Sequence, residues 1–380
     1  MTDSLRITYL SILLLSMTVY NSQIPILRLF FVFMFSISPI LLCFQFKMNI
    51  TKNQFNYLIL WTILCFIYVI YSLLSIFVNS NSLSISITGP AAEFLTPFLI
   101  LSSPFIYLIL ASASKQVLTK SVQIFIYLLV FYLLLDLVVR IMLEPNCFMN
   151  YSCRQQAKTV GLFSTTNVIG TFIIYIYLAL ERFKTPLLKF FLIIILFTAM
   201  ARASIVTLLF ILMIRPIFQS SILLKFISIF FLISSSFFIY LWNPLGIFND
   251  GSLLSKFDFL SSAITSVKNA NLTELIFGFG ASFDRITEVV SVQGYSPHAP
   301  YLKAYFYFGL TGLFLYLILN IFFLVKNFSF FFIILLASLI NGFAGAPIYN
   351  PTIWVSFAIY LLYLYSVKKQ NSKNQDHIII

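Results

Sequence analysis

The first residue that could take part in binding or catalysis is Arg202, in the segment FTAMARASIVTLLF. No other charged residue lies between Lys189 and Arg215, so this guanidinium falls within a long apolar stretch. Because it stays charged near neutral pH, we expect it to face a wet cavity, an acidic partner or an anionic ligand. The alternative is a turn between two short helices, with Arg202 among the headgroups of the outer lipid leaflet.

A second candidate is His298, in GYSPHAPYLKAYFYFG, where Pro297 and Pro300 restrict the backbone on both sides. The chain has only two histidines, and the other, His377, belongs to a polar C-terminal segment. An imidazole titrates at about pH 6.5, which suits general-base catalysis near neutrality. His298 is therefore a candidate base, and a purely structural histidine is the alternative.

Arg285 is a third candidate, in FGFGASFDRITEVV. It follows Gly278 and Gly280, which permit a tight turn or a close approach of the backbone to a ligand. The arginine is a candidate anion-binding residue, or it pairs with its neighbour Asp284 or Glu288.

Three more cations precede this region in the chain: Arg140, Arg154 and Lys158. They could form a cationic rim at the outer face of a membrane, or they could contact lipid headgroups. Arg140 also follows Asp136 by four residues, a spacing at which the two side chains can form an ion pair on one face of a helix.

Composition indicates which elements must position these residues. Hydrophobic residues make up 61% of the 380 positions and charged residues only 9%, and the mean hydropathy is +1.00. A soluble domain carries about 25% charged residues. The polar residues could not cover a water-facing surface, so we expect one integral membrane domain over residues 1–380.

The hydrophobic segments predict an all-α, polytopic membrane helix bundle. A span needs about 20 apolar residues, and the sequence accommodates about 12 transmembrane helices. The predicted segments lie near residues 7–21, 24–44, 57–79, 96–113, 121–143, 161–180, 187–201, 203–214, 222–242, 303–325, 328–341 and 351–367.

Basic residues in the connections predict the orientation of this bundle. With both termini in the cytoplasm, most Lys and Arg residues fall on the cytoplasmic side of the inner membrane. One long periplasmic loop then covers residues 243–302, with an amphipathic helix expected around 252–268, and a shorter outer loop covers 144–160. Long loops in compact proteins are usually functional. The net charge of +12 is spread thinly, so we expect no nucleic-acid partner.

Two of the four cysteines, Cys147 and Cys153, lie together in the shorter outer loop. A disulfide could form there, since the periplasm is oxidising. Two unpaired thiols are the alternative. Cys43 and Cys65 fall inside predicted spans, where we expect them to pack.

Four segments, in their order along the chain, resemble the superfamily of O-antigen polymerases and O-antigen ligases: GLFSTTNVIG, ARAS, FGFG and HAPYLKAYFYFGLTG. The resemblance extends over about residues 160–315. Ala201 replaces the Ser that precedes the arginine in the family pattern, and Ala299 replaces the Asn that follows the histidine. The matching residues are Gly161, Leu162, Phe163, Asn167, Arg202, Gly278, Gly280, His298, Tyr301, Leu302, Gly309 and Gly312.

The resemblance implies a GT-C-like fold and a metal-independent glycosyl transfer at the periplasmic face, with no cofactor. An undecaprenyl-pyrophosphate-linked glycan would be the donor and another the acceptor, with membrane lipids and a chain-length regulator as further partners. His298 would be the catalytic base. The pyrophosphate and the glycan would be bound by Arg202, Arg285, Asn167, Arg154 and Tyr301.

The sequence leaves three functions open. The Phe- and Ile-rich composition favours an O-antigen polymerase, because it suits a strain-specific cluster of glycan genes. An O-antigen ligase, which transfers the glycan to lipid A-core, is the alternative within the family. A polysaccharide-related transporter or flippase is the alternative from another class. The sequence has no internal repeat, and Asp136 is its single candidate for an intramembrane acid, which disfavours a transporter.

Overall fold

The computed structural model describes residues 2–19, 22, 24–45, 52–79, 91–143, 145, 161–162, 166–180, 183, 185–198, 202–219, 261–280, 300–326, 337 and 352–375. Over these residues the chain is helical and contains no strand, as the hydropathy pattern predicts. The helices are α1 (Asp3–Val19), α2 (Pro25–Ser36), α3 (Ser38–Leu42), η1 (Cys43–Gln45), α4 (Lys52–Val78), α5 (Ala91–Ser112), α6 (Lys115–Leu143), α8 (Thr166–Leu180), α9 (Pro186–Thr198), α10 (Arg202–Gln219), α13 (Leu272–Phe277), α15 (Pro300–Lys326) and α17 (Thr352–Gln375).

Three helical stretches are long and apolar enough to cross a membrane: Phe55–Val78, Lys115–Leu143 and Tyr301–Asn320. They indicate a membrane protein. The other predicted segments that fall on described residues are also helical, in shorter or interrupted pieces. The segments at 222–242 and 328–341 lie outside the described residues, except for the single residue 337.

The predicted segment 24–44 is helical, but it is interrupted at one point. It divides at Ile37 into α2 and α3. Pro39 lacks a backbone N–H, and its ring would clash with the carbonyl four residues earlier, at Phe35, so α2 cannot continue through it. The same proline fits the first turn of α3, where no donor is needed.

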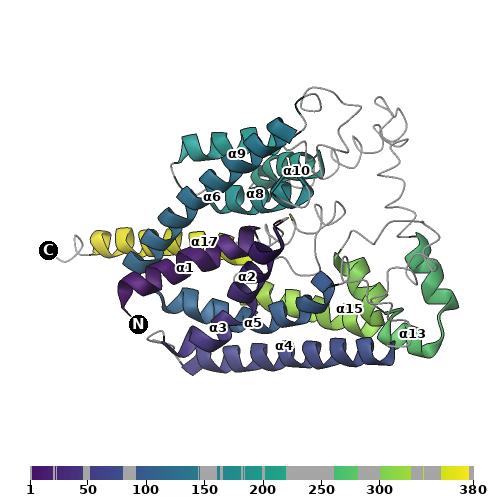
Figure 1. Ribbon diagram of the computed structural model, residues 1–380. Helices are drawn as coiled ribbons and strands as arrows, with labels where there is room; N and C mark the ends of the chain where they lie inside the picture. The colour runs from purple at the N-terminus through teal and green to yellow at the C-terminus, as the bar shows by residue number, and fades with distance from the viewer. Residues whose placement is uncertain are drawn as a thin grey trace.

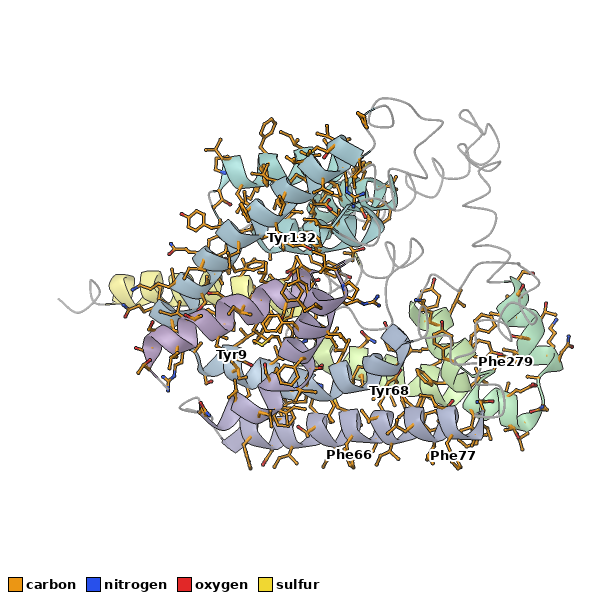
Figure 2. The ribbon with its side chains drawn as sticks, in the orientation of Figure 1. Tyr9, Phe66, Tyr68, Phe77, Tyr132 and Phe279 are labelled. Carbon is orange, nitrogen blue, oxygen red and sulfur yellow. The ribbon has the colours of Figure 1, made fainter. Side chains whose placement is uncertain are left out.

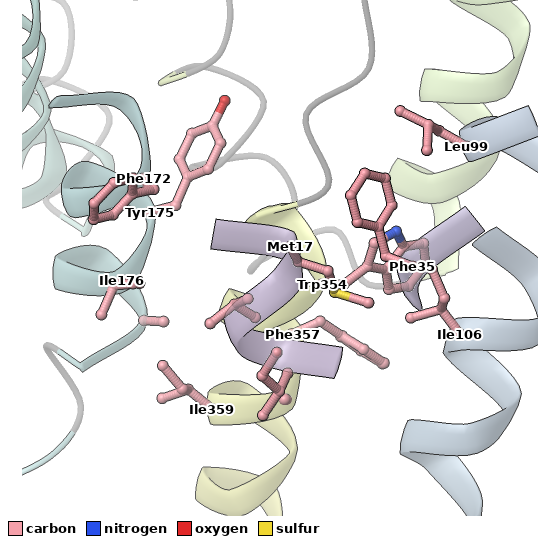
Figure 3. Close-up of a cluster of buried hydrophobic side chains, with 14 of the residues drawn as sticks. Met17, Phe35, Leu99, Ile106, Phe172, Tyr175, Ile176, Trp354, Phe357 and Ile359 are labelled. Atoms are coloured by element: carbon pink, nitrogen blue, oxygen red, sulfur yellow. The ribbon is translucent and has the colours of Figure 1, made fainter. Parts of the chain in front are cut away.

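Helix α17 packs against α1, α8, α6 and α5, and its end reaches the left edge of the bundle in this view (Figure 1). Its Trp354 is fully buried and stacks on Trp61 of α4, with 5.7 Å between ring centroids. Phe357, one turn later, stacks on Tyr107 of α5 at 5.4 Å. On the other side of α17, Ile359 faces Phe172 and Ile176 of α8 (Figure 3). The core is therefore filled by aromatic rings on the side of α17 that faces α4 and α5, and by Ile359 on the side that faces α8.

Helix α4 runs along one edge of the bundle, and α15 and α13 lie against it (Figure 1). In this view α1 begins and α17 ends on the left, whereas α13 and the last turns of α4 lie on the right. The segments that carry the second half of the motif pattern thus lie on the opposite side of this view from the start of α1 and the end of α17.

The predicted loop 243–302 is described only in part. Residues 261–269 are helical, which agrees with the second half of the helix expected at 252–268. Ala263 and Ser266 of this helix are buried, and the Ser266 hydroxyl lies 3.1 Å from the Tyr305 hydroxyl of α15. This part of the loop is therefore packed onto the bundle. The two cysteines proposed to form a disulfide, Cys147 and Cys153, lie outside the described residues.

Candidate functional site

Two motif segments contact each other through their glycines. Helix α13 ends at Phe277 with Gly278 as its C-cap, and α15 is broken at Gly309, where φ is 70° and ψ is −170°. A Cβ on Gly309 would lie 2.1 Å from the carbonyl oxygen of Ile276, and one on Gly278 would lie 2.6 Å from the amide nitrogen of Gly309. Both positions therefore require glycine. The sequence predicted a tight turn or a close approach to a ligand at Gly278, and in the structure the backbone of α15 lies there.

The break in α15 and the end of α13 both leave carbonyl groups without helical partners, as the last turn of a helix does. One of them is used by the FGFG segment itself, because the Phe279 amide donates to the Phe306 carbonyl at 2.8 Å. Phe279 is buried beside these helices (Figure 2). The two chain segments are thus joined by their main chains.

Helix α4 supplies side-chain donors to the remaining carbonyls. The Tyr71 hydroxyl donates to the carbonyls of Ile276 and, at 3.1 Å, Phe308. The Ser75 hydroxyl donates to the carbonyls of Phe277 and, at 3.0 Å, Tyr307. We call the set of Tyr71, Ser75, Gly278 and Gly309 the glycine seam.

Asn79, directly after the end of α4, extends the same row of polar side chains. Its Nδ2 donates to the Ser75 carbonyl at 2.9 Å and lies 3.5 Å from the Phe277 carbonyl. Tyr71, Ser75 and Asn79 are four residues apart, so they share one face of the helix. Sequence analysis missed them, although polar residues at this spacing in an apolar helix indicate a buried partner.

A second anchored point lies at the start of the GLFSTTN segment. Arg140 Nε donates to Asp136 Oδ2 at 2.7 Å, and both side chains are almost completely buried. The Leu162 amide donates to the other carboxylate oxygen, Oδ1, at 2.6 Å. Gly161 lies directly over the pair, since a Cβ there would be 2.7 Å from Asp136 Oδ1. This ion pair confirms the pairing that the spacing predicts. Because the Arg140 side chain is almost completely buried, the expectation that it contacts lipid headgroups is wrong.

The residues proposed to act on substrate are described only in part. Arg202 is the first residue of α10, directly after the short connection from α9, and Asn167 is the second residue of α8. Helices α8 and α10 pack against each other. Tyr301 is the second residue of α15, half-buried at the edge of the hydrophobic core. His298, Arg285 and Arg154 lie outside the described residues.

The seam therefore brings together the backbones of the FGFG and HAPYLKAYFYFG segments, and Asp136 holds the beginning of GLFSTTN. Tyr301 precedes Gly309 in the first half of α15, and Arg202 lies in a separate helix. No protein-family model matches this chain, and no curated protein or solved structure is similar enough to count as a relative.

Proposed function

We propose that this chain is an O-antigen polymerase, which joins undecaprenyl-pyrophosphate-linked oligosaccharide repeat units at the periplasmic face of the inner membrane. The observation that carries the proposal is the order of the four segments GLFSTTN, ARAS, FGFG and HAPYLKAYFYFG along one apolar chain. The contact between Gly278 and Gly309 supports it, because two of these segments then belong to one structural unit.

The chemistry follows from the residue types. A sugar hydroxyl is a poor nucleophile, so His298 would accept its proton as the oxygen attacks the anomeric carbon of the donor. The bond from that carbon to the pyrophosphate oxygen breaks, and the lipid pyrophosphate leaves with the bonding electrons. Arg202 and Arg285 would stabilise the negative charge that develops on this leaving group. Apolar helices suit the polyprenyl tail of such a donor.

The test that separates the candidate functions is the lipopolysaccharide gel pattern of a strain that lacks this chain. We expect core carrying a single repeat unit, which indicates a missing polymerase. Bare core with accumulated lipid-linked polymer would indicate a ligase instead. Failure of any lipid-linked intermediate to reach the outer leaflet would indicate a transporter or flippase.

Variants test the proposed residues in the same strain. We expect His298→Ala and Arg202→Ala to abolish long O-chains while the protein still accumulates in the membrane. His377→Ala is the matched control, because it removes the other histidine and should keep the wild-type ladder. Normal ladders in both site variants would contradict the proposed site.

Arg202→Lys tests how the arginine acts. Lysine keeps the charge but cannot form the two parallel hydrogen bonds that a guanidinium makes to a phosphate. We expect a ladder that is shortened or lost. A wild-type ladder would mean that charge alone is sufficient at position 202.

A further inference from the structure

We infer that Tyr71 and Ser75 of α4 are positioning residues for the transfer reaction, acting through the first half of α15. This inference rests on the proposed function. It starts from the break at Gly309, which makes residues 300–308 a separate short helix. This half-helix begins at Pro300, two residues after the proposed base, and ends in the glycine seam.

A half-helix can move as a unit when its end is not held. Nine residues extend over about 14 Å, so Tyr301, near the start, is about 10 Å from the seam. A small rotation at the seam would therefore displace Tyr301 and the residues next to it along the chain. The hydrogen bonds of the seam fix the angle at which the half-helix leaves α4.

The seam holds two helix ends simultaneously. Tyr71 and Ser75 each lie within hydrogen-bond distance of one carbonyl of α13 and one carbonyl of α15. A hydroxyl has one proton, so each side chain shares that proton between the two helices. Ser75 is fully buried, and so is Tyr307, whose carbonyl is one of its two acceptors, so water has little access to replace this hydrogen bond. Loss of either hydroxyl should loosen α13 and α15 relative to each other.

The same contacts determine where the segment between the two helices starts and ends. The Phe279 amide bonds to the Phe306 carbonyl, so the end of the FGFG turn lies beside the half-helix. The described segments that flank residues 281–299, which end at Gly280 and begin at Pro300, are thus joined by hydrogen bonds. The Ser266 and Tyr305 hydroxyls, 3.1 Å apart, add a further link to this half-helix.

The variants are Ser75→Ala and Tyr71→Phe in the full-length chain. Tyr71→Phe keeps the ring, which stacks on Phe277 with centroids 5.8 Å apart, and removes only the hydroxyl. Ser72→Ala is the matched control, because Ser72 is equally buried on α4 and donates to its own helix, to the Tyr68 carbonyl at 2.8 Å. Ser75→Thr keeps a hydroxyl and should restore the wild-type behaviour.

Two measurements on the purified protein in detergent separate the outcomes. Hydrogen–deuterium exchange reports whether peptides covering 276–280 and 304–309 become less protected. Steady-state transfer, with undecaprenyl-pyrophosphate-linked oligosaccharide extracted from the deletion strain, reports kcat and KM separately. A misplacement of about 1 Å can lower a rate by about a hundredfold, so we expect kcat to fall by about tenfold to a hundredfold with KM nearly unchanged.

The possible results distinguish the positioning role of Tyr71 and Ser75 from the proposed function of the chain. Faster exchange and lower kcat in Ser75→Ala and Tyr71→Phe, but not in Ser72→Ala, would support the positioning role. Wild-type kcat in both seam variants would overturn that role and leave the proposed function standing. No transfer by the wild-type chain would overturn the proposed function and the positioning role together. If Ser75→Ala does not accumulate in the membrane, Tyr71→Phe is compared with Ser72→Ala instead.

Discussion

The buried ion pair between Arg140 and Asp136 illustrates how charge is accommodated at the scale of single residues. The carboxylate accepts from the guanidinium at 2.7 Å and from the Leu162 amide at 2.6 Å. A charge inside an apolar helix is costly unless it is neutralised and hydrogen-bonded. Here the Asp136 carboxylate neutralises the Arg140 guanidinium and accepts a hydrogen bond from it. The same carboxylate links α6 to the GLFSTTN segment.

Removing one partner of this pair should be strongly destabilising. Asp136→Ala leaves a buried guanidinium and a backbone amide without their acceptor, and we expect a loss of about 3–5 kcal/mol in unfolding free energy. The measurement is the thermal unfolding midpoint in detergent, which should fall markedly. Asp3→Ala is the control, because Asp3 is exposed and its oxygen lies 3.5 Å from Arg6. The loss there should be at most about 1 kcal/mol.

At the scale of elements, the break in α15 is the feature on which the site geometry depends. Gly309 has a φ of 70°, and the space beside it is filled by the carbonyl group of Ile276. The break gives α15 two parts with different partners. The first part belongs with α13 and the seam, and the second continues the membrane-spanning stretch to Asn320.

Gly309→Ala should lower the free energy of unfolding for two reasons. The added Cβ clashes with a backbone atom and disfavours the positive φ, and together these effects should cost about 2–4 kcal/mol. Thermal unfolding in detergent checks the prediction. Leu310→Ala, at the half-exposed neighbouring position, should change the stability by no more than about 1 kcal/mol. Equal thermal unfolding midpoints for Gly309→Ala and Leu310→Ala would argue against the close packing of Gly309 against Ile276.

The elements themselves were largely predictable, because long apolar runs have few alternatives to the helix. The segment expected at 57–79 corresponds to α4 at Lys52–Val78. The division at Ile37 was missed because hydropathy does not detect what a single proline does to a helix. The membrane topology and the roles of His298 and Arg202 stay predictions.

The seam could not be predicted from the sequence. Its hydrogen bonds join Tyr71 and Ser75 to carbonyls more than two hundred residues later in the chain. The acceptors are main-chain carbonyls, which every residue has, so neither composition nor periodicity indicates which of them accept these hydrogen bonds. The glycines of FGFG suggested a tight turn or a close approach to a ligand, whereas the structure places the backbone of Gly309 next to Gly278.

At the scale of the whole molecule, α4 presents two contrasting faces. Trp61, Tyr68 and Ser75 are buried against the bundle, whereas Phe66 and Phe77 are 54% and 76% exposed and point away from it (Figure 2). An uninterrupted exposed row of large apolar side chains suits contact with lipid. The edge of the bundle that α4 forms is thus expected to face the acyl chains.

Phe66→Lys tests this assignment. A lysine near the centre of a spanning helix costs about 3 kcal/mol on insertion scales, so the amount of carbonate-resistant protein in membranes should fall. Phe66→Leu should insert as the wild type does. Full insertion of the lysine variant would indicate that this face of α4 is covered by protein or water.

The acceptors of the glycine seam are carbonyl oxygens, which every amino acid possesses. Ile276 and Tyr307 could therefore be exchanged for other large apolar residues without losing a single acceptor, whereas Gly278 and Gly309 could not. Related chains could thus vary the side chains at these acceptor positions and still keep the hydrogen bonds that join α4, α13 and α15.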